Sequence, residues 1–424
     1  MHTVRSTLGA WALLGAVFLG GCSTDSSGAQ GGTATDNDTS RGGATQAVAA
    51  GGSTQDTTSG GTGNEDSTAV DADYNYTGPG SFYDADINTD GTYSIQVSEG
   101  VGQPVLFTIS GSYTRLSTGF LRMLVEDVQG SADDAPSVGD EALALEVPGF
   151  ALLLRPLGGQ DIIPMLVSGN CPTEDFDANW IIAQSPDVRD ATDPERDWFG
   201  TFSYDYASAS AFLPAKYNLA TFADISESIP KELSATSCEQ GRLTIAEDAN
   251  SSVNMWLTDG GAIVEVLQDG QKNETVLAML QRPMSMADLQ GSYAAFVLQG
   301  PPVEPGTQGG TSSMGDAGMA PGEAPEPFPA VITLDDQGAG TGRAYDDVVL
   351  GVTGDDGVEF AVGNPNDPAD GWLKGTIGNG EGGSGNLACS ALTDAADSGK
   401  TVIFCIGQDP GQPQVKFTLV MVGQ

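Results

Sequence analysis

The residues best suited to chemistry form an acidic stretch at 86–91, which reads Asp-Ile-Asn-Thr-Asp-Gly. Side-chain oxygens at alternate positions followed by glycine are typical of a calcium loop, where the oxygens converge on a hard cation. The twelfth position of an EF-hand loop should be a bidentate Glu, and here it is Val97, so that motif is incomplete. The stretch still predicts a calcium site, with these ligands: Asp84, Asp86, Asn88 and Asp90. The alternative interpretation is an Asp-Gly turn that begins a strand. No other cofactor is expected.

The only histidine is His2, which lies in the signal peptide expected at 1–21, so histidine-dependent catalysis is excluded for the mature protein. This removes Ser-His-Asp and Cys-His mechanisms and His-ligated metals. A glycosidase-like pair of carboxylates remains open, with Asp177 near Trp180 and Asp197 beside Trp198 as candidates. The tryptophans are equally well explained as core residues on strands. We therefore assign no catalytic residue and predict that the protein is not an enzyme, with a carboxylate-only hydrolase as a third alternative.

The first 21 residues have the features of a secretory signal peptide. Arg5 supplies a positive charge, and residues 8–18 form an apolar run too short to span a bilayer permanently. Leu-Gly-Gly at 19–21 then precedes Cys22. This order resembles the lipobox of bacterial lipoproteins, which implies that Cys22 is lipidated and becomes the mature N-terminus. The alternative is an ordinary secreted protein.

The residue after Cys22 bears on localisation. Ser23 stands where lipoproteins retained at the inner membrane carry Asp. The resemblance therefore implies an outer-membrane lipoprotein, attached to the membrane through its N-terminal lipid and placed at the periplasmic face or the cell surface.

Four cysteines remain if one of the five carries lipid. An even number in an exported chain predicts two disulfides, and four cysteines allow three connectivities. We favour the connectivity that keeps each bridge within one expected domain. The predicted pairs are Cys171–Cys238 and Cys389–Cys405.

The charge balance is strongly acidic, with 16 Lys and Arg against 57 Asp and Glu and a net charge of −41. Such a surface repels phosphate backbones and anionic headgroups, which excludes nucleic acid as a partner. A halophilic adaptation or a coat that keeps the protein soluble explains the acids better than storage of cations does.

Composition divides the mature chain into a tether and two β domains. Residues 22–75 are Gly, Ser, Thr, Asp and Asn with almost no large apolar side chain, so they predict a disordered tether. Short β segments separated by turns then predict an N-terminal β domain at 76–283 and a C-terminal one at 284–424. Within the second domain, the Pro- and Gly-rich residues 301–329 predict a disordered loop.

The expected fold class is all-β, with two disulfide-stapled antiparallel domains built as barrels or sandwiches. Helical content is expected to be limited to a few short turns, with 220–227 as one candidate. Candidate strands of the first domain are 92–97, 104–113, 120–128, 142–154, 162–167, 180–183, 198–206, 242–246, 253–257, 262–267 and 275–281. Those of the second, an eight-stranded meander, are 292–298, 330–334, 340–345, 358–362, 372–377, 387–391, 401–406 and 415–422.

The C-terminal domain opens with Asp-Leu-Gln-Gly-Ser-Tyr at 288–293. This resembles the Gly-x-Trp opening of lipocalin-like barrels, with Tyr293 in place of Trp. The resemblance implies a closed barrel that holds one small apolar ligand. Duplication of the two domains stays open, because no repeat aligns.

Together these features predict a non-enzymatic, lipid-anchored envelope protein that binds a small apolar ligand or a glycan. The alternative is a structural or adhesive surface lipoprotein, with contacts that depend on calcium. Its protein partners are not indicated by the sequence.

Overall fold

The structure is a computed structural model that describes most of residues 72–424; the longest stretches outside the description within this range are 185–197 and 300–326. The signal peptide, Cys22, nearly all of the tether and most of the 301–329 loop lie outside the described residues. So does Asp197, one of the two candidate acids beside tryptophan.

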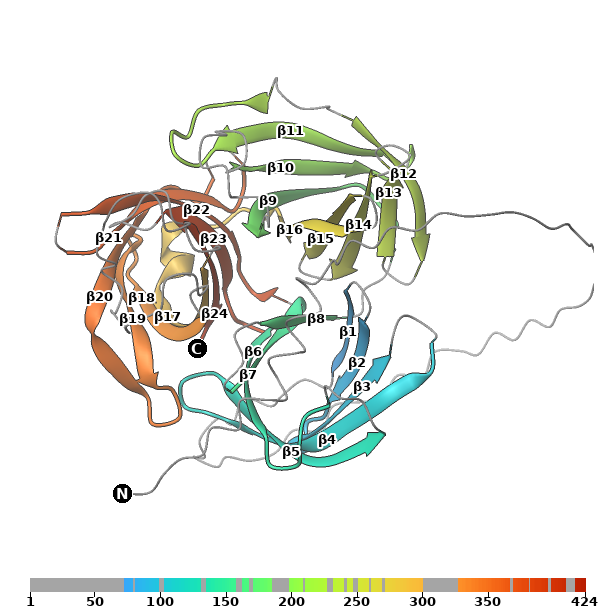
Figure 1. The fold of residues 1–424 in the computed structure, drawn as a ribbon. Helices are drawn as coiled ribbons and strands as arrows, with labels where there is room; N and C mark the ends of the chain where they lie inside the picture. The colour runs from blue at the N-terminus through green and yellow to red at the C-terminus, as the bar shows by residue number, and fades with distance from the viewer. Residues whose placement is uncertain are drawn as a thin grey trace, which may run out of the picture.

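The described strands form three closed barrels, each of eight antiparallel strands that follow one another in the sequence (Figure 1). The first barrel contains β1 (Ala72–Gly78), β2 (Ser81–Ile87), β3 (Thr92–Ser98), β4 (Val105–Arg115), β5 (Leu121–Gly130), β6 (Glu141–Val147), β7 (Ala151–Pro156) and β8 (Ile163–Val167). It closes where β1 pairs with β8, with Tyr74 opposite Val167.

The second barrel closes between its first and last strands, β9 and β16. Its strands are β9 (Phe176–Gln184), β10 (Trp198–Asp205), β11 (Ser210–Asn218), β12 (Glu232–Glu239), β13 (Arg242–Ala246), β14 (Ser251–Thr258), β15 (Gly261–Gln268) and β16 (Gln271–Leu280). β14 and β15 pair along their whole length, from Ser251 opposite Gln268 to Thr258 opposite Gly261.

The third barrel follows a 3-10 helix at Met286–Leu289 and closes between β17 and β24. Its strands are β17 (Gly291–Gln299), β18 (Phe328–Leu334), β19 (Ala339–Asp347), β20 (Val352–Val362), β21 (Trp372–Gly378), β22 (Ser384–Leu392), β23 (Val402–Gln408) and β24 (Lys416–Gly423). The all-β class, the two disulfides and the eight-stranded C-terminal meander barrel are confirmed.

Strand pairing corrects the expectation of a single β unit at 76–283. This range contains two closed sheets, separated between β8 and β9. The sequence hides the boundary because both barrels consist of similar short strands joined by similar turns. The first barrel also begins earlier than expected, since β1 starts at Ala72, inside the predicted tether.

One local expectation is also wrong. The expected strand at 142–154 is two strands, β6 and β7, joined by a turn in which Gly149 has a φ of 66°. Glycine adopts this left-handed conformation without the steric penalty of a side chain. Residues 220–227, the candidate helical turn, include turns after β11: the amide of Phe222 bonds to the carbonyl of Asn218, and Ser226 has 3-10 conformation, while residue 227 lies outside the described residues.

Side chains inside the first and third barrels form two separate apolar cores. On β3 the inward residues alternate, and Tyr93, Ile95 and Val97 are all buried in the first barrel. In the third barrel Tyr293, Phe360 and Leu419 belong to the corresponding interior core.

A further apolar core lies between the barrels and is built from their outer faces. It contains residues of all three sheets, including Phe150, Phe199 and Phe404. Phe120 packs edge-on against Phe296 at 5.1 Å between ring centroids, and Phe150 packs against Phe404 at 4.7 Å. The barrels are therefore joined through buried side chains, and the three surround a common centre in Figure 1.

Candidate functional site

The 86–91 stretch forms the turn of the β2–β3 hairpin. The amide of Gly91 donates to the carbonyl of Asn88 at 3.2 Å, and Gly91 has a φ of 86°. Oδ1 of Asp90 accepts hydrogen bonds from the amide and the hydroxyl of Thr92, at 3.0 and 2.6 Å. These bonds favour the ionised carboxylate and lower the pKa of Asp90.

Two of the four predicted calcium ligands, Asn88 and Asp90, form hydrogen bonds with Thr92 in this arrangement. Asp84 and Asp86 have exposed side chains on β2, and the Asn88 amide group donates to the Thr92 hydroxyl at 3.0 Å. Among the described residues, no group of three or more His, Cys, Asp or Glu side chains is placed to hold a metal ion. The geometry fits an Asp-Gly turn, and calcium binding stays a prediction.

The carboxyl groups with displaced pKa values do not have the properties of a general acid. The pKa values of Asp90, Asp205 and Asp288 are all lowered. For Asp288 the main cause is the amide of Ser285, which donates to Oδ2 at 2.7 Å. A general acid needs a raised pKa, so these three carboxylates act as structural hydrogen-bond acceptors.

The candidate pair of Asp177 and Trp180 does not form a sugar-stacking site. Asp177 is exposed on β9, where it accepts a hydrogen bond from the hydroxyl of Ser203. Trp180 is buried, and its ring packs near Phe202 at 6.1 Å. The interpretation of Trp180 as a core residue is the one that fits.

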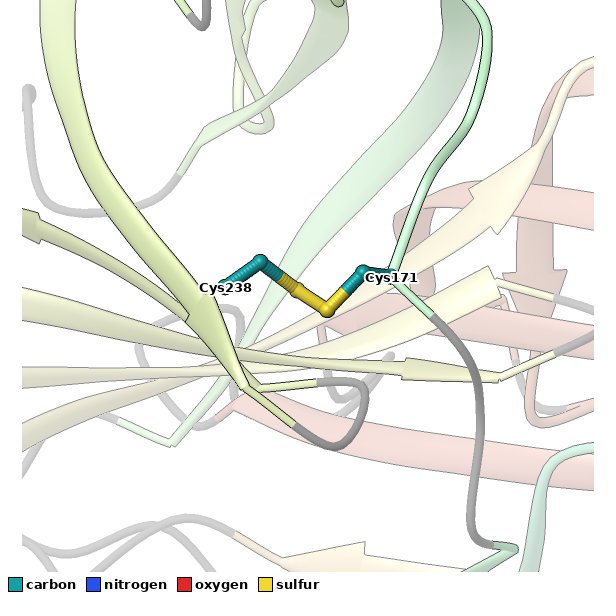
Figure 2. The surroundings of a disulfide bond; sticks show 2 residues. All are labelled: Cys171 and Cys238. Atoms are coloured by element: carbon teal, nitrogen blue, oxygen red, sulfur yellow. A yellow bond between two sulfur atoms is a disulfide. The ribbon is translucent and has the colours of Figure 1, made fainter. Parts of the chain in front are cut away.

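The four described cysteines are paired as expected. Cys171, just before β9, is bonded to Cys238 of β12, so this bridge lies within the second barrel (Figure 2). Cys389 of β22 is bonded to Cys405, its direct partner on β23. The first barrel contains no cysteine.

The interior of the first barrel has a hollow of about 20 Å³. This volume is close to that of one water molecule. Its lining is apolar apart from the hydroxyls of Tyr83 and Tyr93, and burial raises the pKa of Tyr93. Ligand-binding pockets measure roughly 300–1,000 Å³, so this hollow is too small for a lipid or a drug-sized molecule.

Buried side chains pack at the start of the third barrel. Tyr293, the residue that replaces the expected Trp, is buried, and its hydroxyl donates to the carbonyl of Leu289 at 2.6 Å. Leu289 is itself buried at the end of the 3-10 helix. The motif therefore contributes to packing at the start of the barrel.

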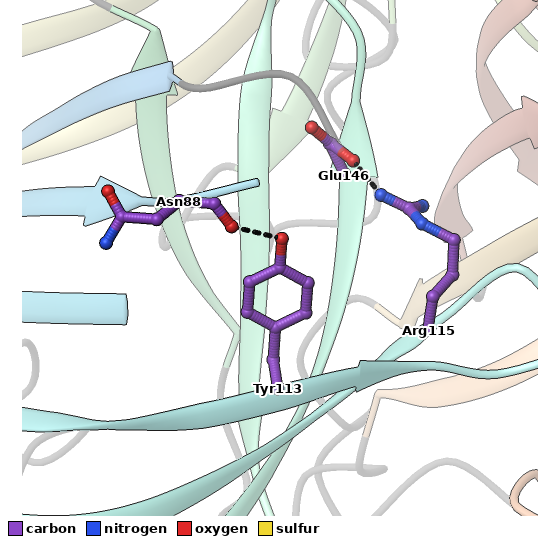
Figure 3. A network of polar contacts seen from close by, with 4 residues as sticks. All are labelled: Asn88, Tyr113, Arg115 and Glu146. Atoms are coloured by element: carbon purple, nitrogen blue, oxygen red, sulfur yellow. Dashed lines mark hydrogen bonds and ion pairs between the residues drawn. The ribbon is translucent and has the colours of Figure 1, made fainter. Parts of the chain in front are cut away.

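A polar network lies near the junction of the first and third barrels (Figure 3). Tyr113 donates to the carbonyl of Asn88 at 2.5 Å, and Arg115 forms an ion pair with Glu146 at 2.6 Å. The charges of Arg115 and Glu146 both affect the pKa of Lys400 in the third barrel. Its pKa is lowered, first by burial and then by the repulsion of Arg115, while Glu146 acts in the opposite direction.

Polar contacts also connect the second barrel to the third. The side-chain amide of Asn386 donates to the carbonyls of Leu219 and Ala220 at 3.0 and 2.6 Å. Nζ of Lys374 lies 4.8 Å from the ring centroid of Tyr217. The third barrel therefore contacts both the first and the second barrel, through polar contacts as well as the shared apolar core.

The surface feature that the sequence analysis missed is the tip of the β19–β20 hairpin. Three apolar side chains project there with large exposed fractions: Val349 at 40%, Leu350 at 75% and Val352 at 49%. We call these three residues the apolar tip. The signal was present as Val-Val-Leu-Gly-Val between acidic residues, but such a run is also typical of a buried strand.

Comparisons with known proteins give remote similarity only. No protein-family model and no curated protein matches the sequence. A variant of transferrin-binding protein B from Haemophilus parasuis is 10% identical over 81% of this chain and 65% of that one, with a TM-score of 0.24. Isotype 1 transferrin-binding protein B from serogroup B Neisseria meningitidis is 11% identical over 81% and 66%, with a TM-score of 0.24.

A protein of unknown function from Nostoc punctiforme, of the DUF3598 family, is 11% identical over 59% of this chain and 95% of that one, with a TM-score of 0.22. TM-scores this low carry no argument about the function of the present chain. Among the described residues, no helix combines the length and apolarity needed to cross a membrane.

Proposed function

We propose that this protein is a non-enzymatic, lipid-anchored envelope protein that contacts another macromolecule through its outer surface. The observation that supports this proposal most directly is the filling of the first and third barrels by their own described side chains. A carrier of a small apolar ligand needs an interior cavity, and the hollow in the first barrel measures about 20 Å³. The adhesive or structural interpretation therefore stands ahead of the carrier interpretation.

The sequence supports the anchored, exported part of the proposal. The signal-peptide pattern and Cys22 indicate lipidation, and disulfides are typical of oxidising compartments outside the cytoplasm. The tether of about fifty residues would hold the barrels away from the membrane. Ser23, which follows Cys22 where lipoproteins retained at the inner membrane carry Asp, is the reason we propose the outer membrane.

Mass spectrometry of the full exported chain, purified from its own host, tests the proposal. We expect the native mass to equal the mass measured under denaturing, non-reducing conditions, because no small ligand is carried. An additional non-covalent mass of a few hundred daltons in the native spectrum would overturn the proposal and support a carrier. The covalent mass also reports the lipid, which Cys22→Ser should remove.

The same measurement with a chelator separates the calcium prediction from the rest. A mass of calcium that disappears with the chelator, and is absent from Asp86→Ala, would make the β2–β3 turn a metal site. Spectra that do not change with the chelator would leave that turn a structural hairpin.

A further inference from the structure

We propose that the apolar tip of the β19–β20 hairpin is the docking site for a protein partner whose apolar pocket is rimmed by Lys and Arg. This inference rests on the proposed function, since it names the part of the outer surface that makes the contact. It commits to a cationic protein as the occupant.

Exposure is the first observation that supports a docking role. Val349, Leu350 and Val352 are close neighbours in the chain, and each exposes at least two fifths of its surface. Single exposed apolar residues are common on soluble proteins, whereas a contiguous group of them costs free energy in water and marks an interaction site.

The tip is also held in place by its surroundings. Oδ1 of Asp347 accepts hydrogen bonds from the amides of Val349 and Leu350, both at 3.0 Å. Below the tip, the hydroxyl of buried Thr118 in the first barrel donates to the carbonyl of Val348 at 3.2 Å. The loop therefore presents its apolar side chains without needing to be ordered on binding, which lowers the entropic cost of association.

The base of the hairpin is fixed to the first barrel by aromatic packing. Tyr345 of β19 meets Phe120 edge-on, with 6.3 Å between the ring centroids. Phe120 is fully buried in the shared core, and Tyr345 is packed against that core. The tip consequently sits on the rigid junction of two barrels, to which the β19–β20 hairpin extends in Figure 1.

Charge selects the partner. Asp346, Asp347 and Asp355 have exposed side chains close to the tip in the sequence, and the whole chain carries a net charge of −41. A second copy of the chain or an anionic lipid surface would be repelled, whereas a cationic protein would be attracted and oriented. An apolar pocket with a basic rim is complementary to both features.

Site-specific photo-crosslinking tests the inference on the full chain in its own cell envelope. The probe is benzoylphenylalanine placed at position 350, and in a matched control at position 138. Val138 is the control because it is 65% exposed but belongs to the first barrel, away from the tip in the sequence. We expect the probe at position 350 to form an adduct with a protein of net positive charge. The probe at position 138 should form no adduct with that same partner.

The affinity of the identified, purified partner for the full chain and its variants is then measured. Leu350→Ser should weaken binding at least tenfold, and Asp346→Lys should weaken it and flatten its salt dependence, while Val138→Ser should leave it unchanged. Thermal melting of each variant verifies folding. No adduct at position 350, an adduct with a second copy, with lipid or with an acidic protein, or equal binding by Leu350→Ser would overturn the inference. An adduct formed at position 138 alone would reject the tip while leaving the proposed function in place.

Discussion

Tyr293 packs inside the third barrel and is expected to make the stability of the protein sensitive to alkaline pH. The hydroxyl donates to the carbonyl of Leu289, and the ring lies in the interior core of the third barrel. Burial raises the pKa of Tyr293 from 10.0 to about 12. The phenolate forms readily only in the unfolded chain, so the neutral hydroxyl favours the folded state.

The pH dependence follows from this raised pKa. The contribution of Tyr293 to the free energy of unfolding is complete below pH 10 and is lost as the pH rises towards 12. Tyr293→Phe should be about 1 kcal/mol less stable at neutral pH, because it loses one hydrogen bond. Its free energy of unfolding should fall less steeply than that of the wild type between pH 10 and 12.

Urea denaturation at a series of pH values measures this difference. The other buried tyrosines are present in both proteins, so only the contribution of Tyr293 differs. Phe360→Leu is the matched control because Phe360 lies in the same interior core and carries no hydroxyl, so its curve should run parallel to that of the wild type. Parallel curves for Tyr293→Phe and the wild type above pH 10 would contradict the assignment.

The residue types at 86–90 predicted side-chain oxygens that can accept hydrogen bonds or bind a cation. They did not predict which of these two roles each oxygen has in the fold. The spacing of Asp86, Asn88 and Asp90 indicated side-chain oxygens near a sharp turn, and the structure has the turn. Oδ1 of Asp90 accepts hydrogen bonds from Thr92, and this local role competes with metal binding by the same carboxylate. Spacing alone does not distinguish these two uses, because both require an acceptor just before a glycine.

At the scale of elements, the bridge between β22 and β23 fixes a pair of neighbouring strands. Cys389 and Cys405 are direct cross-strand partners, and 16 positions separate them in the sequence. A disulfide that closes a loop of about this size stabilises a protein by about 3 kcal/mol, mainly by restricting the unfolded chain. Both cysteines are buried in the interior core of the third barrel.

The double variant Cys389→Ala/Cys405→Ala should therefore lose about 3 kcal/mol of unfolding free energy. Non-reducing urea denaturation measures the loss, and reduction of the wild type in the same assay should reproduce part of it. Cys171→Ala/Cys238→Ala is the comparison for the second barrel, where the bridge spans 67 positions. If the first double variant retains wild-type stability, the bridge does not stabilise the fold.

Strand prediction succeeded where apolar and polar residues alternate between clear turns. All eight candidate strands of the third barrel correspond to β17–β24. It failed for β1, β2, β11 and β12, whose sequences carry Asp, Asn, Ser, Pro or Lys in place of a continuous apolar pattern. In these strands pairing with neighbours overrides weak local preference.

At the scale of the whole molecule, the shared core makes the three barrels dependent on one another. β7 shows how this is encoded, because Leu152 and Leu154 face the interior of the first barrel while Leu153 belongs to the shared core. The sequence carries a continuous apolar run here, which is typical of a strand buried on both faces. It did not indicate what covers the second face, because that partner lies in another barrel, far away in the chain.

Phe150→Ala tests this dependence. The wild type should unfold in a single calorimetric transition, because its barrels share buried surface. The Phe150 ring packs on Phe404, and its loss should lower the free energy of unfolding by roughly 3–5 kcal/mol. The first barrel should then unfold separately, at a lower temperature than the other two.

Phe107→Ala is the control for this prediction, because it removes a ring from the interior of the same barrel and leaves the contact with the third barrel intact. It should lower the melting temperature without dividing the transition. Independent transitions for the barrels in the wild type would show that the shared core does not couple them.

The closure of each sheet restricts how any partner can recognise this protein. In every barrel the first strand pairs with the last: β1 with β8, β9 with β16, and β17 with β24. Closure of a sheet reduces the free edge on which another chain can add a strand through backbone hydrogen bonds. Fibril-like growth from these sheets is disfavoured for the same reason. Closure therefore favours recognition through side chains and loops, so partner choice can change by substitution at hairpin tips while the barrels beneath stay the same.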